Sequence, residues 1–94
     1  MYYDLEKING LFNEYNLYGK LSFEGEYLNG KRNGKGKEYY DNGKLRFEGK
    51  YLNGKRNGKG KEYNYEGKLT FEGECLNGIK FNGKFYDSKK IYMI

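Results

Sequence analysis

A 24-residue repeat constrains this chain more than any other feature of its sequence. Residues 23–46 read FEGEYLNGKRNGKGKEYYDNGKLR, and residues 47–70 read FEGKYLNGKRNGKGKEYNYEGKLT. A third unit opens at Phe71 with FEGECLNG and then diverges. Units this short stack on their neighbours to bury a core, and atypical end units cap such an array. We therefore expect a single domain over residues 1–94, with a degenerate capping unit at 1–22, full repeats at 23–46 and 47–70, and a divergent unit at 71–94.

Each unit has the pattern of β-strands. Phe23, Gly25 and Tyr27 share one face of an alternating run, and Glu24 and Glu26 share the other. The chain has 15 glycines, placed at regular intervals, and glycine disfavours helix. The expected fold is all-β: an elongated, twisted, single-layer antiparallel meander of tandem β-hairpins.

Two turn signals recur in each unit. Asn42-Gly43 predicts a short hairpin turn, because both residue types tolerate positive φ. The run Asn29–Arg32 predicts a wider four-residue loop. Centring hairpins on these two turns gives one consistent register. Its predicted pairs are Glu24–Lys37, Glu26–Lys35, Tyr27–Gly34, Lys37–Glu48, Gly36–Gly49 and Gly34–Tyr51.

This register separates the two faces by chemistry. One face carries rows of Glu and Lys that mostly neutralise each other, with Lys35 opposite Lys50 as a like-charge exception. The other face alternates rings and glycines in the order Tyr27, Gly34, Tyr51, Gly58 and Cys75. A glycine beside each ring leaves room for the ring to lie over the neighbouring backbone. Glu38 and Glu62 fall among the phenylalanines of this second face.

The pattern F-E-G-E/K-Y-x-N-G-K-x-N-G-x-G-x-x-Y-x-x-G-K resembles the MORN (membrane occupation and recognition nexus) repeat. The resemblance is close over two units, partial over the third and weak over the first. Asn33 and Asn57 stand where the family often has His, and Tyr27 and Tyr51 often correspond to Trp or Phe. These departures resemble a divergent, bacterial-type branch that includes antitoxin-like members. The resemblance implies a row of hairpins with an aromatic groove, and a role in protein contact, dimerisation or membrane attachment.

The residue types argue against catalysis. The chain has no histidine, which is the commonest general base and metal ligand. Cys75 occupies the slot of Tyr27 and Tyr51, so we interpret it as a structural substitution rather than a nucleophile. The segment Gly34–Lys37 lacks the flanking strand, helix and Lys-Ser/Thr pair of a phosphate loop. We expect no catalytic residue, no metal site and no cofactor.

Three surfaces are candidates for binding. The first is a partner groove on the aromatic face, formed by Phe23, Tyr27, Phe47, Tyr51, Phe71 and Leu45; the less favoured alternative is that these side chains serve only to fold the sheet over itself. The second is a row of anion-binding loops with Lys31, Arg32, Lys55, Arg56 and Lys80, whose charges could equally be solvated and silent. The third is an open edge strand with Ile91, Tyr92, Met93 and Ile94, which predicts homodimerisation or strand addition to a partner.

The leading functional hypothesis is a non-catalytic protein-interaction module, in the manner of a small inhibitor or antitoxin-like binder. The alternative is peripheral binding of anionic phospholipid, which the formal charge of +5 favours. Nucleic-acid binding is less favoured, because glutamates such as Glu24 and Glu48 interrupt any positive face. The first residues show no secretion signal, so we expect a cytoplasmic protein.

Overall fold

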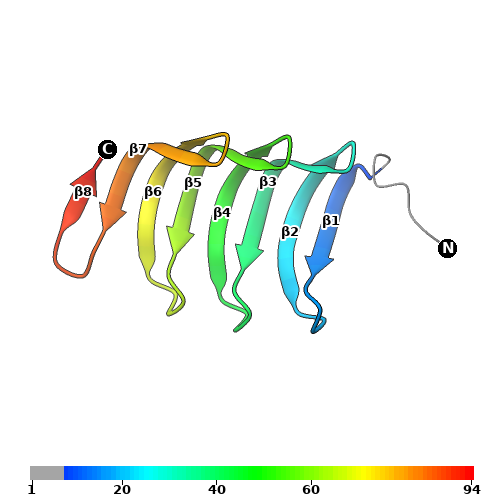
Figure 1. Cartoon of the computed structure of the whole chain (residues 1–94), viewed down its shortest axis with the longest axis horizontal. Coiled ribbons are helices and arrows are strands. Elements are labelled where there is room, and N and C mark those ends of the chain that lie inside the picture. Colours follow the sequence, from blue (N-terminus) through cyan, green and yellow to red (C-terminus); the bar gives the residue numbers. More distant parts are fainter. Residues whose placement is uncertain (1–7) are drawn as a thin grey trace.

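The computed structural model describes residues 8–94, which form eight antiparallel strands in one open sheet (Figure 1). The strands are β1 (Gly10–Tyr15), β2 (Leu21–Leu28), β3 (Lys31–Tyr39), β4 (Leu45–Leu52), β5 (Lys55–Tyr63), β6 (Leu69–Leu76), β7 (Ile79–Tyr86) and β8 (Ile91–Met93). The strands lie side by side in chain order, and the molecule measures 52 × 27 × 15 Å along its principal axes. The predicted elongated all-β meander is therefore confirmed. Residues 1–7 of the predicted capping unit lie outside the described residues, and residues 8–94 contain no helix able to span a membrane.

The turn between β2 and β3 differs from the predicted four-residue loop. Asn29 and Gly30 alone form it, with φ values of 51° and 80°. Two consecutive positive φ angles define the tight turn whose twist matches that of a hairpin, and Asn-Gly is its preferred sequence. Asn53 and Gly54 repeat this geometry. Arg32, predicted in a loop, therefore lies inside β3.

A bulge then restores the predicted pairing. The predicted partner of Tyr27 was Gly34, but Tyr27 pairs with Arg32. The three residues 33–35 therefore lie opposite Glu26 alone. Glu26 does not face Lys35 in the regular ladder; its carboxylate accepts a hydrogen bond from the backbone N–H of Lys35 at 2.8 Å. Beyond the bulge the predicted partners meet, and the confirmed pairs are Glu24–Lys37, Lys37–Glu48, Gly36–Gly49, Gly34–Tyr51 and the like-charge pair Lys35–Lys50.

The connection between β3 and β4 is longer than the predicted short turn. Tyr40 and Lys44 close it through a backbone hydrogen bond of 2.9 Å, and Gly43 has φ 86°. The Asn42 side chain accepts from the Lys44 N–H at 2.9 Å. A register shift between Glu38 and Tyr39 absorbs the extra residue, so the pairs nearer the strand centres keep their predicted register.

The core lies on one face of the sheet and is made by rings packed on glycine. Phe23, Phe47 and Phe71 are fully buried. A Cβ atom added to Gly36 would lie 2.5 Å from the Phe23 ring, and one added to Gly60 would lie 2.4 Å from the Phe47 ring. The rings therefore occupy the space that side chains at these glycines would fill. We call this side of the sheet the packed face.

The last repeat unit shortens the bulge. Cys75 pairs with Lys80 and Glu74 with Asn82, so Phe81 alone is extra. Phe85 takes the place that Glu38 and Glu62 hold in the earlier units, opposite Phe71. Their ring centroids lie 4.9 Å apart, so an aromatic pair ends the packed face.

Candidate functional site

The predicted aromatic groove is not a groove. Phe23, Phe47 and Phe71 have no exposed surface, and Tyr51 is also buried. Tyr27 and Leu45 are half-buried at the margins of the same face. The prediction was wrong because cationic side chains cover the rings. The Arg32 guanidinium lies 4.0 Å from the centre of the Phe23 ring, and that of Arg56 lies 4.0 Å from the Phe47 ring.

These cations belong to an ion-pair ladder that crosses the packed face. Arg32 donates to Glu14 at 2.8 Å, and Arg56 donates to Glu38 and Glu62, each at 2.9 Å. Lys80 continues the ladder by donating to Glu62 at 2.7 Å. The ladder explains why Glu38 and Glu62 lie among phenylalanines, as predicted: each carboxylate has a basic partner from the next unit.

Tyrosine hydroxyls complete the ladder. Tyr27 donates to Glu14, and Tyr51 donates to Glu38. Cys75 stands in the corresponding place of the third unit and has no hydroxyl to donate, while Lys80, in the place of Arg32 and Arg56, donates to Glu62. The Cys75 thiol is buried, and burial raises its pKa, which disfavours the reactive thiolate.

The ladder also shifts the pKa values of its members. Burial alone would raise the pKa of Glu38, but hydrogen bonds from Arg56 and Tyr51 outweigh it and lower the pKa below 4.5. The pKa values of Glu14 and Glu62 are lowered in the same way. Burial and the bond to Glu14 raise the pKa of Tyr27 to about 12. Carboxylates with lowered pKa values stabilise the fold above about pH 4.5, and this contribution is lost as the pH falls through the folded-state values.

The predicted row of anion-binding loops is therefore two separate groups. Arg32, Arg56 and Lys80 lie in strands on the packed face, where ion pairs neutralise them. The two-residue turn places them there, because it starts the following strand two residues earlier than predicted. Lys31 and Lys55 remain exposed beside the turns.

A trough of about 870 Å³ runs along the opposite face, across β1 to β6. Its floor is a strip of glycine backbone made by Gly25, Gly36, Gly49, Gly60 and Gly73. These residues pair in register across the sheet, and the long strands arch around the strip (Figure 1). The side-chain positions of these glycines point to the packed face, so backbone is accessible on the trough side between two rows of charged side chains. We call this side the trough face.

In one row of the trough the charges largely compensate one another. It alternates in sign in the order Glu24, Lys37, Glu48, Lys61 and Glu72. Lys61 lies 3.7 Å from Glu72, and tyrosine hydroxyls from Tyr39 and Tyr63 donate to Glu24 and Glu48. This row agrees with the predicted Glu–Lys ladder.

The other row carries an excess of positive charge at its centre, although Lys59 pairs in register with Glu74. Its order across β2 to β6 is Glu26, Lys35, Lys50, Lys59 and Glu74. Lys35 pairs directly with Lys50, and the Lys50 side chain lies opposite the bulge that contains Lys59. Within residues 8–94, none of the three ammonium groups lies within ion-pair distance of a carboxylate. The like-charge pair was visible in the sequence, but its importance was missed because the groove was placed on the other face.

The turn edge of the sheet carries a second, smaller pattern. Leu28, Leu52 and Leu76 are exposed at the ends of β2, β4 and β6. Leu28 pairs with Lys31, and Leu52 pairs with Lys55. Each of the two full repeats thus has one leucine–lysine pair at this edge, whereas Leu76 pairs with Ile79.

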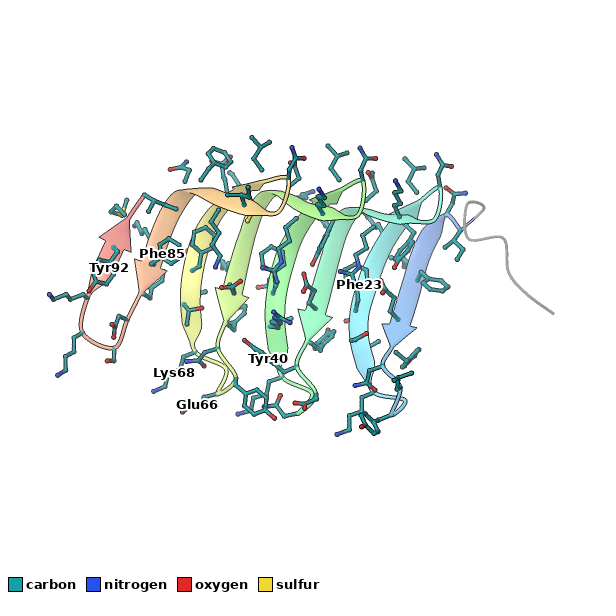
Figure 2. All side chains as sticks on the ribbon, in the orientation of Figure 1. Phe23, Tyr40, Glu66, Lys68, Phe85 and Tyr92 are labelled. Atoms are coloured by element: carbon teal, nitrogen blue, oxygen red, sulfur yellow. The ribbon has the colours of Figure 1, made fainter. Side chains whose placement is uncertain are left out.

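The predicted open edge is confirmed as a strand. Ile91–Met93 form β8, which pairs with β7 on one side only, and Ile94 continues the pairing through two hydrogen bonds with Gly83. Figure 2 shows Tyr92 on β8 beside Phe85 on β7, which are paired in register. The four side chains from Ile91 to Ile94 are about half exposed or more. Their backbone groups on the outer side are open to another strand.

The described residues contain no cluster of His, Cys, Asp and Glu suited to a metal ion.

The family model of the MORN repeat matches residues 23–44 and 47–68. These segments begin where the two full repeats were predicted to begin. No match was found among curated proteins.

Proposed function

Because the chain carries two tandem MORN repeats, a repeat generally associated with protein or membrane-lipid interaction, we propose that it is a non-catalytic protein-interaction module. The observation that carries this proposal is the trough. It spans six strands and presents glycine backbone between two charged rows. A partner segment lying there would contact backbone and side chains together, which is the arrangement of a binding cleft rather than of a packed surface.

The division of labour between the two faces supports the same proposal. The packed face uses its rings, arginines and glutamates on one another. The trough face contributes little to the core, so its residues are free to serve a partner. We further propose that the chain acts as a small inhibitor of the antitoxin-like kind, which covers a surface of its partner by holding one segment of it.

A capture experiment with matched charge reversals tests the module. Two variants, Lys50→Glu/Lys59→Glu in the trough and Lys31→Glu/Lys55→Glu at the turn edge, change the net charge equally. Immobilised wild-type chain is expected to retain one stoichiometric protein from its source lysate at low and high salt. The turn-edge variant should retain the same amount of this protein, and the amount retained by the trough variant should fall at least tenfold. Equal retention by both variants would contradict a role for the trough.

The alternative function, binding of anionic phospholipid, rests on the turn edge. Leucines such as Leu28 and Leu52 would enter the interface while Lys31 and Lys55 contact lipid phosphates. Flotation with phosphatidylserine vesicles separates the two functions. Salt-sensitive vesicle binding that the turn-edge variant loses, together with no captured protein, would favour the membrane function.

The open edge supports a separate proposal, namely that the chain forms a homodimer through β8. Pairing of two exposed β8 strands would satisfy their outer backbone groups and cover Ile91 and Met93. In sedimentation experiments, we expect the full chain to be dimeric and a chain truncated after Lys89 to be monomeric. Identical sedimentation of the two chains would exclude the proposal.

A further inference from the structure

The charge pattern of the trough specifies what kind of segment it holds. The row from Glu26 to Glu74 is acidic at both ends and basic over its three central positions. Each position lies on the next strand, and neighbouring strands are about 4.8 Å apart. The three lysines therefore span about 10 Å, and the two terminal glutamates are about 19 Å apart.

The charged groups at the ends of this row have hydrogen-bond partners, whereas those at its centre form no ion pair among the described residues. Glu26 accepts the backbone N–H of Lys35 at 2.8 Å, and Glu74 accepts the side-chain amide of Asn82 at 3.1 Å. Lys35, Lys50 and Lys59 are exposed and form no ion pair within residues 8–94, although Lys59 lies opposite Glu74 in register. Repulsion between adjacent ammonium groups is relieved by negative charge placed over them. The strongest electrostatic demand of the trough is thus for anionic groups at its centre.

The spacing selects a helix over an extended strand. Same-side residues of a strand recur about every 6.7 Å, so three carboxylates would span about 13 Å and drift out of step with the lysines. On a helix, residues at i, i+3 and i+7 share one face and rise by about 4.5 and 10.5 Å. This progression matches three lysines on adjacent strands. A basic residue one turn beyond each end would meet Glu26 or Glu74.

We propose that the trough binds an amphipathic helix of a partner protein that lies across the strands, with a stripe of three carboxylates over Lys35, Lys50 and Lys59 and a basic residue near each end. This inference rests on the proposed function and names the chemistry of the partner. The floor lets the helix approach the backbone closely, because the side-chain positions of its residues point away from the trough, to the packed face.

Designed peptides test the inference directly. An 18-residue alanine-based helix carries Lys at positions 2 and 16 and Glu at positions 6, 9 and 13, labelled for fluorescence anisotropy. A control peptide of the same composition places the three glutamates on different faces. We expect the striped peptide to bind about tenfold more tightly than the control, the ratio appropriate to three exposed ion pairs.

A charge exchange makes the test specific. The variant Lys35→Glu/Lys50→Glu/Lys59→Glu should lose the striped peptide and gain a peptide with the opposite pattern, Glu at 2 and 16 and Lys at 6, 9 and 13. Circular dichroism checks that the variant is folded. Equal binding of all three peptides to the wild-type chain, or no binding of any, would overturn the helix proposal. Stronger competition by an anionic vesicle or oligonucleotide than by the striped peptide would overturn it as well.

The capture experiment remains independent of this result. A captured protein that depends on Lys50 and Lys59 would still support the protein-interaction module when no designed helix binds. If no protein is captured and no designed helix binds, both the protein-interaction module and the helix proposal are contradicted.

Discussion

Replacing Phe47 with alanine is expected to lower the free energy of unfolding by about 3–5 kcal/mol. Phe47 is fully buried at the centre of the packed face, against Gly60 and beneath the guanidinium of Arg56. A single-layer sheet has no second layer that can collapse into the cavity. Because a domain of this size is stable by only about 5–15 kcal/mol, we expect much of the stability to be lost.

Urea denaturation followed by circular dichroism measures this loss. Phe81→Ala is the matched control, since Phe81 is an exposed phenylalanine in the bulge of β7. The control should cost less than about 1 kcal/mol. Similar losses for the two variants would mean that the packed face is not the core of the molecule.

Arg56→Ala is expected to cost about 3–5 kcal/mol, because it leaves Glu38 on the packed face without an ion pair and leaves Glu62 with Lys80 alone. The Arg56 side chain is 18% exposed, and those of Glu38 and Glu62 are 16% and 23% exposed. The same change also uncovers the Phe47 ring. Arg46→Ala is the control, because Arg46 is an exposed arginine of β4 that has no ion pair within residues 8–94.

The pH dependence of this difference distinguishes ion pairing from packing. The pKa values of Glu38 and Glu62 are lowered in the folded chain, so both groups are charged at pH 7 and become neutral only below pH 4.5. The gap in stability between wild type and Arg56→Ala should therefore narrow as the pH falls from 7 to 3. A gap that is unchanged over this range would show that Arg56 acts only by covering the ring.

Much of the fold follows from repeat arithmetic alone. Pairs such as Glu24–Lys37 depend on where a hairpin is centred, and a four-residue loop has the same outer register as a two-residue turn followed by a bulge. The predicted outer pairs were therefore correct, although the turn was not. The inner pairs separate the two solutions: Tyr27 meets Arg32, which brings that arginine over Phe23. The positive φ of Asn29 and Gly30 is the physical reason, and the Asn-Gly signal was present in the sequence.

The binding surface was harder to predict. Alternation assigned Phe23 and Glu24 to opposite faces correctly, but it carries no information about which face is hollow. That depends on how the strands arch along the glycine strip and on whether the rings are covered. The position of Glu38 and Glu62 among the phenylalanines and the like-charge pair Lys35–Lys50 were the two available signals. Together they indicate that the charged side chains of the packed face pair with one another, and that the trough face carries an excess of positive charge at its centre.

The measurement that tests this account most directly is site-specific photo-cross-linking. A benzophenone amino acid is placed at Lys50 in the trough, and in separate chains at Lys55 on the turn edge and at Lys68 on the opposite edge (Figure 2). In source lysate, the account predicts one cross-linked protein from position 50 and little or none from positions 55 and 68. Cross-linking from position 55 or 68, with none from position 50, would contradict the assignment of binding to the trough.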